Sequence, residues 1–176
     1  EGEKKLEYLN SVLDMLDRAQ NEKDISDIRR ELVETGFLKK AKAGTQRKLK
    51  EQQPIKYISD DGYEILVGRS NIQNDMLTFK MARRTDRWLH VQKIHGSHVI
   101  IKCDGLEPPE LTLQQAASIA GYHSQGRAGG KTTVDHTMVR NVRKPTGALP
   151  GKVIYSDYSS LMAQADEALV ERLMVR

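Results

Sequence analysis

The chain of 176 residues is poor in cysteine and in aromatic residues, with one Cys, one Trp and two Phe. A single cysteine excludes a disulfide framework within the chain and fits a reducing compartment. No stretch approaches the roughly 20 consecutive apolar residues of a membrane-spanning helix, which excludes a transmembrane protein. The chain begins at Glu1 rather than Met and shows no basic and apolar leader, so we expect a piece of a longer protein.

Charge is what the chain does contain. Charged residues make up 30% of it and apolar residues only 38%, which predicts a lean core. The formal net charge is +4. This mild basic excess is compatible with a nucleic-acid partner, although many basic proteins bind no polyanion.

The first part of the chain has the pattern of two helices. Leucines spaced three, four and three residues apart form a narrow apolar stripe, at Leu6, Leu9, Leu13 and Leu16. The rhythm resumes at Ile25, Ile28 and Leu32, with Asp24 as the expected N-cap and Gly36 as the expected residue after the helix. We therefore predict a helical hairpin over residues 1–38, and the narrow stripe favours the end of a coiled coil.

A basic segment, 39–56, follows the hairpin and is almost without apolar residues. Its cations are Lys39, Lys40, Lys42, Arg47, Lys48, Lys50 and Lys56. Such a run is usually a solvated linker, and an arm that touches phosphates is the alternative. Pro54 marks the expected boundary to a second domain, 57–176.

The second domain alternates short strands with helices. Strands are expected at 63–67, 88–91, 98–102 and 152–155, and looser alternation covers 133–143. Helices are expected at 71–82, capped by Asn71, at 112–124, capped by Thr112, and over much of 162–175. This order predicts an α+β fold with a mixed or antiparallel sheet and flanking helices.

The glycine-rich segment Gly126–Thr132 resembles a phosphate-binding P-loop only superficially. Gln125 stands where that motif needs its first glycine, and a helix rather than a strand is predicted before the loop. The helix N-terminus that would hold the phosphates is therefore absent from the predicted position. We reject nucleotide hydrolysis and expect a flexible loop in which Arg127 and Lys131 grip a phosphate backbone.

Two further kinds of site find little support. His95, His98 and Cys103 lie within nine residues, but a structural zinc site needs four ligands and no second cysteine exists. Cys103 ends an apolar strand, where a free cysteine behaves as a small buried apolar residue. No pair of carboxylates suggests acid–base chemistry either. We therefore expect no metal, no cofactor and no catalytic residue.

Several cations and rings have the placement of RNA contacts. Basic side chains at the ends of elements suit phosphates, and unpaired bases stack on aromatic rings. The candidate rings are Trp88, His90, Tyr122 and His123. Ordinary solvated charges and a core tryptophan are the alternative, and for Trp88, beside Leu89 and Val91, we favour the core.

The residues of the second domain resemble the NFACT-R domain of the NFACT family over roughly residues 57 to 156. This family includes the bacterial proteins called fibronectin-binding protein A, and NEMF and Caliban. The matching segments are Gly62 to Asn71, Gln73 to Asp75, Leu77, Thr78, Lys80, Asp86, Trp88 to His90, Gly96 to Ile100, Thr112 to Tyr122, Val134, Asp135, Val139, Arg140 and Lys144 to Gly151. The segment 159–163 and Ser70 depart from the family pattern.

The resemblance implies a cytoplasmic role in ribosome-associated quality control. Such a factor binds a large ribosomal subunit that still holds peptidyl-tRNA, and it recruits tRNA so that an alanine tail is added to the stalled chain. The ribosome makes the peptide bonds, so the resemblance implies an RNA-binding module and no enzyme. It also implies that the hairpin is the returning end of a coiled coil. The rival expectations are a fibronectin-binding surface adhesin and a structural adaptor that contacts ribosomal protein.

Two groups of site residues follow. We expect a cationic surface for rRNA or tRNA phosphates made of Arg69, Lys80, Arg83, Arg84, Arg127, Lys131, Arg140 and Lys144. We expect the fold beneath it to be organised by Asn71, Asn74, Asp86, Trp88, His90 and His98.

Overall fold

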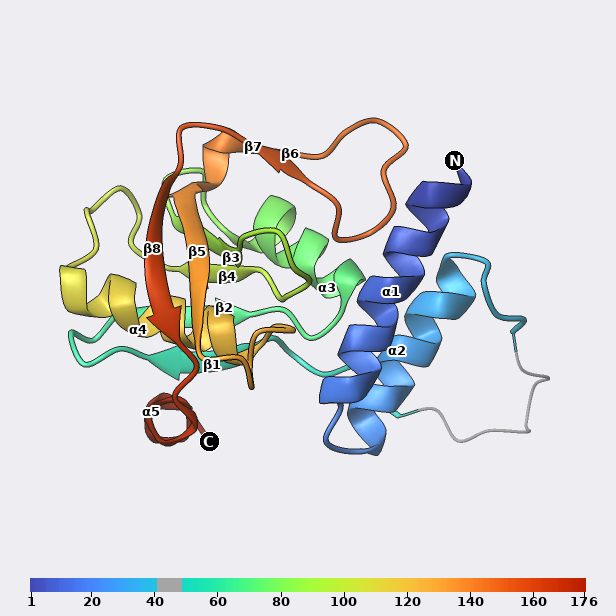
Figure 1. Ribbon diagram of the computed structural model, residues 1–176, viewed down its shortest axis with the longest axis horizontal. Coiled ribbons are helices and arrows are strands. Elements are labelled where there is room, and N and C mark those ends of the chain that lie inside the picture. Colours follow the sequence, from blue (N-terminus) through green and yellow to red (C-terminus); the bar gives the residue numbers. More distant parts are fainter. Residues whose placement is uncertain (41–48) are drawn as a thin grey trace.

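The computed structural model describes residues 1–40 and 49–176, so residues 41–48 of the predicted basic linker lie outside them. Two antiparallel helices, α1 (Gly2–Arg18) and α2 (Glu22–Glu34), form the predicted hairpin and pack beside an α+β body (Figure 1). The body is built on a six-stranded sheet of order β1-β2-β4-β3-β5-β8 in which every neighbouring pair is antiparallel. The α+β prediction is thus confirmed, with an antiparallel sheet.

The strands are short, and most lie where alternation predicts them. They are β1 (Ile55–Ile58), β2 (Glu64–Val67), β3 (Arg87–Val91), β4 (Val99–Ile101), β5 (Lys131–Met138) and β8 (Ser159–Gln164). A separate two-stranded ribbon joins β6 (Val142–Arg143) and β7 (Ile154–Tyr155). The predicted linker boundary falls inside β1, because Lys56 pairs with Leu66 of β2.

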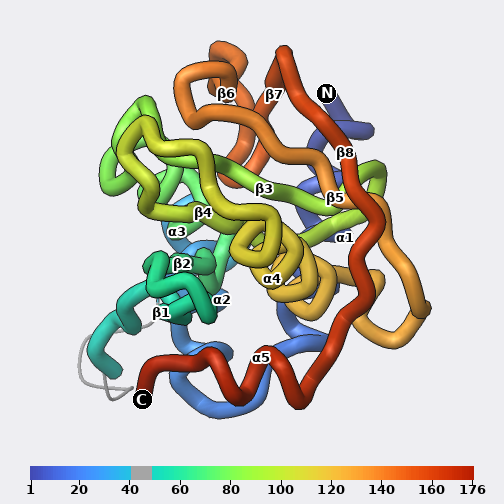
Figure 2. Tube along the Cα trace, turned by 90° about the vertical axis from the view of Figure 1, so that its left-hand side faces the viewer, coloured from blue at the N-terminus to red at the C-terminus, as the bar shows by residue number. Residues whose placement is uncertain are grey.

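The two faces of the sheet are covered by different elements. Leu89 and Val91 point to the face that carries α4 (Glu110–Tyr122) and α5 (Glu167–Leu173), and the main core lies there. Figure 2 shows α4 crossing this face. Trp88 points to the opposite face, into a smaller core with Leu77, Ile100 and Val142. That face is covered by α3 (Asn71–Met76), a π-helical turn η1 (Leu77–Met81), the 3₁₀ turn η2 (Val139–Asn141) and the β6–β7 ribbon.

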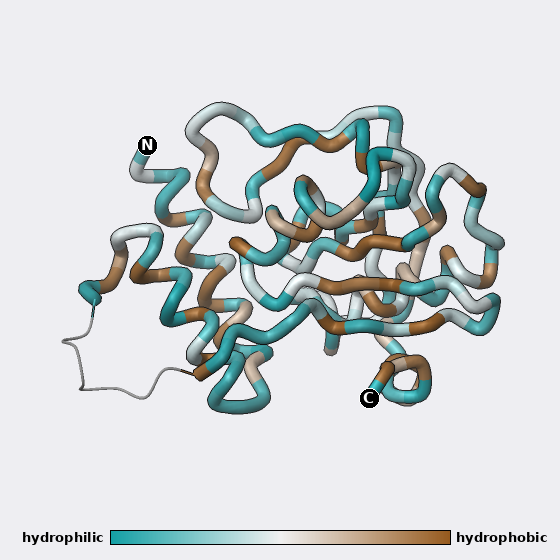
Figure 3. The backbone as a smooth tube through the Cα atoms, turned by 180° about the vertical axis from the view of Figure 1, so that it is seen from behind, coloured by the Kyte–Doolittle hydropathy of each residue, from teal (hydrophilic) through white to brown (hydrophobic). Residues whose placement is uncertain are grey.

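The hairpin is not buried along its leucine stripe. Tyr8, Val12 and Met15 make the buried face of α1, together with Ile28 of α2. Leu6 and Leu13 remain 61% and 57% exposed, and Figure 3 shows apolar segments along the hairpin as well as within the sheet. The stripe predicted the helix correctly, but the seam lies on the neighbouring face because the hairpin also packs against the body.

A buried carboxylate joins the hairpin to the body. Glu31 of α2 accepts hydrogen bonds from the Tyr8 hydroxyl (2.6 Å), from Asn71 Nδ2 (3.3 Å) and from the Ile72 backbone N–H (2.7 Å). Asn71 Nδ2 also donates to Ser11 Oγ of α1. Burial raises the pKa of Glu31, and these donors oppose that rise. The start of α3 is therefore tied to both helices of the hairpin.

The expected helix caps are displaced by one turn or less. The α2 N-cap is Asn21, whose side chain accepts from the Asp24 N–H, while Asp24 accepts from the Gln20 N–H. Ser70 caps α3, which frees Asn71 for its contacts with the hairpin. Gly36 has φ 85°, as expected of the residue that follows a helix.

Two helix predictions in the second half of the body need correction. The helix α4 begins at Glu110, and Thr112 is a buried residue that bonds to Ser59 and Asp61 instead of capping. The segment predicted as a helix from 162 begins as strand β8, and only Glu167–Leu173 is helical. The helical spacing of Leu169 and Leu173 correctly indicated α5. The residues before it, 159–164, lie in the sheet because they pair with β5.

Candidate nucleic-acid interface

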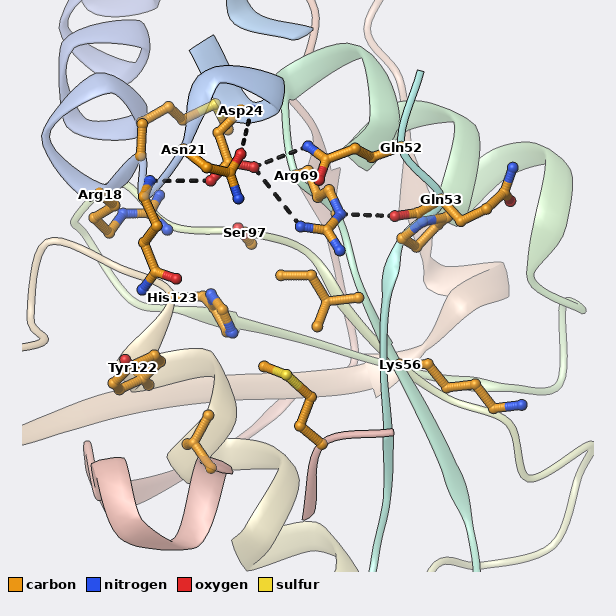
Figure 4. A pocket seen from close by; sticks show the side chains of 18 of the residues that line it. Arg18, Asn21, Asp24, Gln52, Gln53, Lys56, Arg69, Ser97, Tyr122 and His123 are labelled. Carbon is orange, nitrogen blue, oxygen red and sulfur yellow. Dashed lines mark hydrogen bonds and ion pairs between the residues drawn. The ribbon is translucent and has the colours of Figure 1, made fainter. Parts of the chain in front are cut away.

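A pocket of about 640 Å³ lies where the hairpin turn, the start of β1, the end of α4 and the C-terminal residues meet. Four arginines line it, and with them two acidic residues: Arg18, Arg69, Arg127 and Arg176, and Asp24 and Glu171. Figure 4 shows the labelled side chains Arg18 and Arg69 on its walls, with His123 and Tyr122 nearby. We name it the arginine pocket.

Arg127 is held in place by the end of α4. Its guanidinium carbon lies 3.8 Å from the centroid of the Tyr122 ring, and its Nε donates to the Tyr122 carbonyl at 2.6 Å. Among the described residues no acceptor engages its two terminal nitrogens. The predicted glycine loop therefore presents Arg127 in one orientation, with donors left for a ligand.

Arg69 and Arg18 reach the pocket from opposite sides. Arg69 Nε donates to the Gln53 carbonyl at 2.7 Å, and its Nη1 lies 3.7 Å from Asp24 Oδ1 (Figure 4). Arg18 pairs with Asp14 one turn earlier in α1, at 2.7 Å. Both carboxylates compensate part of the charge, but a guanidinium has five N–H donors, so donors remain available.

His123 shows how positive the pocket is. Its Nε2 shares a 2.7 Å hydrogen bond with the Tyr57 hydroxyl, in the floor of the pocket. Burial lowers the pKa of His123 well below its ordinary value, and the charges of Arg18, Arg127 and Arg69 lower it further. Burial and the nearby guanidinium groups therefore favour the neutral imidazole, and the positive charge on this side of the pocket comes from the arginines.

The other predicted cations lie elsewhere. Arg83, Arg84 and Arg140 meet at one corner of the body, where the Arg140 N–H donates to the Arg84 carbonyl, and Lys80 lies on the preceding η1 turn. Arg83 pairs with Asp104 at 2.6 Å. Lys131 opens β5, opposite Gln164 of β8.

Lys144 is bound into the fold. Its Nζ donates to the Leu149 and Lys152 carbonyls, at 2.6 and 3.0 Å, and pairs with Asp75 Oδ2 at 2.9 Å. These bonds close the loop 145–151 and hold it against α3, since the Gly151 N–H also donates to Asp75. The geometry gives Lys144 a role in shaping this loop.

The residues expected to organise the fold are nearly all buried. Asp86 accepts from the Arg83, Cys103 and Asp104 N–H groups and pairs with Lys102 at 3.1 Å. Burial alone would raise the pKa of Asp86, but these partners bring it below the ordinary value. Asn74 accepts from the His98 N–H at 3.1 Å, and His98 Nδ1 bonds to Thr78.

Trp88 and His90 lie in one stack. Trp88 is fully buried, and its ring stacks on His90 with centroids 5.7 Å apart. The core placement of Trp88 is thus as expected, and its face is not open to a base. Cys103 is also buried, which raises the pKa of its thiol.

Reasoning from the sequence missed one pocket residue, Arg18, and gave another, His123, a different role. Arg18 ends α1 and reads as an ordinary helix-end cation, because only docking of the hairpin brings it to the body. His123 was assigned to base stacking, yet it is buried behind the arginines. One feature of the sequence could have indicated this pocket: the pair Tyr122-His123 stands at the end of a predicted helix, directly before the glycine loop.

No helix in residues 1–40 and 49–176 has the length and apolar character that crossing a bilayer demands. Within the same ranges, no group of three or more His, Cys, Asp or Glu side chains is placed to hold a metal ion.

Comparisons with known proteins show which family the chain resembles. The family described as the NFACT protein RNA binding domain matches residues 53–157. The chain is 39% identical over 174 residues to the Rqc2 homolog RqcH of Bacillus subtilis (strain 168), covering 98% of this chain and 30% of that protein. It is 41% identical over 160 residues to the Rqc2 homolog RqcH of Streptococcus pneumoniae serotype 2, covering 90% of this chain and 28% of that protein.

A solved structure is also similar over nearly the whole chain. It is the C-terminal part of the fibronectin/fibrinogen-binding protein from Streptococcus suis, with a TM-score of 0.91 and 38% identity, covering 98% of this chain and 68% of that one. The chain spans about 30% of the length of the curated relatives it matches. The RNA-binding domain model, the relatives and the shared fold together show that this chain belongs to the NFACT family.

Proposed function

We propose that this chain is the RNA-binding module of a ribosome-associated quality-control factor, and that the arginine pocket binds a backbone phosphate of tRNA or rRNA. The observation that carries the proposal is the meeting of Arg18, Arg69 and Arg127 around a neutral, buried His123. One guanidinium group can donate two parallel hydrogen bonds to the oxygens of a phosphate. Such backbone contacts position RNA without reading its sequence.

Membership of the NFACT family supports an RNA ligand over other anions. A second support is the arrangement of the cations. The corner with Arg84 and Arg140 lies on a different part of the body from the arginine pocket, so two contact regions would span several phosphates of one RNA. Binding would then weaken steeply with salt, because each neutralised phosphate releases counterions.

For the complete factor we propose a cytoplasmic role on the large ribosomal subunit. The factor binds a subunit that carries peptidyl-tRNA and recruits tRNA for alanine tailing of the stalled chain. The ribosome forms the peptide bonds, so this module performs no catalysis and uses no cofactor. Its contribution is to hold RNA phosphates in register.

The test measures binding of fluorescein-labelled tRNA by anisotropy across a salt series. The Arg69→Gln, Arg127→Gln double variant is expected to lower affinity at least tenfold and to reduce the salt slope by about 0.7 to 0.9 for each phosphate that it no longer neutralises. Arg29→Gln, on the exposed surface of α2 and outside both proposed contact regions, is the matched control and should change affinity less than twofold. Unchanged tRNA affinity in the double variant would refute the site.

Sedimentation with purified large subunits separates the rival functions. RNA binding predicts that the double variant loses subunit binding, whereas an adaptor that contacts ribosomal protein would keep it. The similar structure from Streptococcus suis carries a name that includes fibronectin binding. An adhesin function would require saturable fibronectin binding by this chain that persists at high salt, and we expect none.

A further inference from the structure

A second cavity, of about 660 Å³, lies on the face of the sheet opposite α4. It is enclosed by α1, by the β3–β4 turn and by the loop 145–153, which extends toward α1 in Figure 1. Its floor includes Trp88, His90, His98 and Tyr155. Cavities of this size hold small organic ligands. None of the cations of the arginine pocket lines it, so it is a separate site, which we name the tryptophan cavity.

The floor of the tryptophan cavity is a set of packed rings. The His90 ring lies parallel to Trp88, within 9°, and His98 meets both rings edge-on, at 85° and 86°. Tyr155 lies 4.7 Å from Trp88 and is fixed by a 2.6 Å hydrogen bond from its hydroxyl to Asp135. His90 and Tyr155 are only partly buried, whereas Trp88 and His98 are buried, so His90 and Tyr155 are the rings that a ligand can reach.

This floor is uncharged but polar. Burial lowers the pKa of His90 and, further, of His98, so both imidazoles are neutral at pH 7. His90 Nε2 bonds to the Gly96 carbonyl at 3.2 Å, which fixes its ring plane. Trp88 Nε1 is buried and has no acceptor among the described residues. An orphaned buried donor is rare in proteins, and here it lies in the floor of a cavity.

The rim of the tryptophan cavity, unlike its floor, is charged. Lys4 and Lys5 of α1 and Lys93 of the β3–β4 turn line the cavity, and within the described residues no carboxylate pairs with any of the three. Lys152 is paired with Glu7 at 3.2 Å, and Asp14 is paired with Arg18. Glu1 is the remaining acidic residue of the rim. The free charge of the rim is therefore positive.

We propose that the tryptophan cavity binds one unpaired nucleotide of an RNA, with its base on the His90 ring and its phosphate among the rim lysines. The inference rests on the proposed RNA-binding function and adds a base-binding site to it. Flat, neutral rings suit the face of a base, and stacking on such a ring changes affinity by roughly 5- to 150-fold. An acidic peptide would use the lysines but would leave the ring floor without a matching surface.

The first experiment uses the single tryptophan of the chain as its probe. AMP, CMP, GMP and UMP are titrated while the fluorescence of Trp88 is followed. At least one monophosphate is expected to quench it saturably, the matching nucleoside about tenfold more weakly, and inorganic phosphate not at all. A fluorescence response to poly-glutamate that equals the response to nucleotides would overturn the proposal in favour of a peptide.

Variants then locate the site. His90→Ala is expected to weaken mononucleotide binding at least tenfold, while His90→Phe, which keeps a flat ring, should retain it and shows that loss in the alanine variant is not misfolding. Lys93→Gln should weaken binding about threefold, and Lys23→Gln, on the exposed surface of α2, should not change it. Loss of mononucleotide binding in Arg69→Gln, Arg127→Gln but not in His90→Ala would overturn the proposal.

The same titrations distinguish failure of this site from failure of the proposed function. If tRNA binds with salt-dependent affinity but no monophosphate quenches Trp88, the tryptophan cavity is not a nucleotide site and the proposed function stands. If neither tRNA nor any monophosphate binds, the proposed RNA-binding function is wrong and this inference falls with it.

Discussion

Arg127 lies over the ring of Tyr122, with its guanidinium carbon 3.8 Å from the ring centroid, and donates through Nε to the carbonyl of the same residue. Two interactions with one residue restrain the position of the guanidinium. An arginine fixed in this way loses little conformational entropy when it binds a phosphate. The end of α4 thus turns a mobile loop cation into an oriented one.

The Tyr122 ring is expected to contribute to RNA affinity without touching RNA. Tyr122→Ala should weaken tRNA binding about 2- to 5-fold, the equivalent of the roughly 0.5–1 kcal/mol of an exposed cation–π contact. Tyr122→Phe keeps the ring and is the matched control, with no expected change. Anisotropy at fixed salt measures both variants, and equal affinities for the alanine variant and the parent would contradict the role of the stack.

Lys144 is expected to affect stability more than RNA affinity. Lys144→Met removes donors to two carbonyls and the partner of Asp75, which should lower the free energy of unfolding by about 1.5–3 kcal/mol. Chemical denaturation measures this, and hydrogen exchange should speed up in residues 145–151. The salt slope of tRNA binding should stay at the parent value. If the salt slope of tRNA binding fell by the equivalent of one phosphate while stability stayed unchanged, Lys144 would be a phosphate contact and not a structural residue.

Gly68 is expected to tolerate no side chain. A Cβ at this position would overlap Asn74 Oδ1 and approach the Asn74 Cα to 3.1 Å. Asn74 Oδ1 cannot move freely because it accepts from the His98 N–H. Gly68→Ala should therefore cost about 1–3 kcal/mol of stability, as overpacked sites do. Gly129→Ala, where the nearest atom is 3.7 Å away, is the control, and similar unfolding midpoints for the two variants would refute this account.

His123 predicts a loss of stability in mild acid. Its pKa in the folded chain is well below the ordinary 6.5, because burial and three arginines disfavour the imidazolium. The unfolded chain therefore binds the proton first, so the contribution of His123 to stability is full above pH 6.5 and declines as the pH falls through the folded pKa. Between the two pKa values the decline has a limiting slope of roughly 1.4 kcal/mol per pH unit.

His123→Gln removes this titration and keeps an acceptor for the Tyr57 hydroxyl. The unfolding free energies of the parent and of His123→Gln are measured by urea denaturation at pH 8 and pH 5. Between these two pH values the parent should lose more stability than the variant. A difference that stays constant with pH would show that His123 is protonated as easily in the folded chain as in the unfolded one.

Short-range patterns predicted the elements well. Alternation around Trp88 indicated a buried strand, and Trp88 is fully buried in β3. The same reasoning failed for 159–164, because burial alternates along this edge strand but hydropathy does not: the apolar Met162 is exposed and the small Ala163 is buried. It also misplaced the seam of α1, since the leucine stripe is more apolar than the face that carries Tyr8. In both segments, contacts with distant elements overrode the local pattern.

The sequence by itself determined the class of fold, the resemblance to the NFACT-R domain and the cations available for RNA. Only the tertiary structure decided which cations share a site: it joined Arg18 and Arg69 to Arg127, placed Lys144 in the fold and enclosed His90 in a second cavity. The physical reason is the sequence distance over which the deciding interactions act. Helix and strand periodicity depends on neighbours a few residues away, whereas these sites arise from docking of the hairpin through Glu31 and from strand pairing between distant segments.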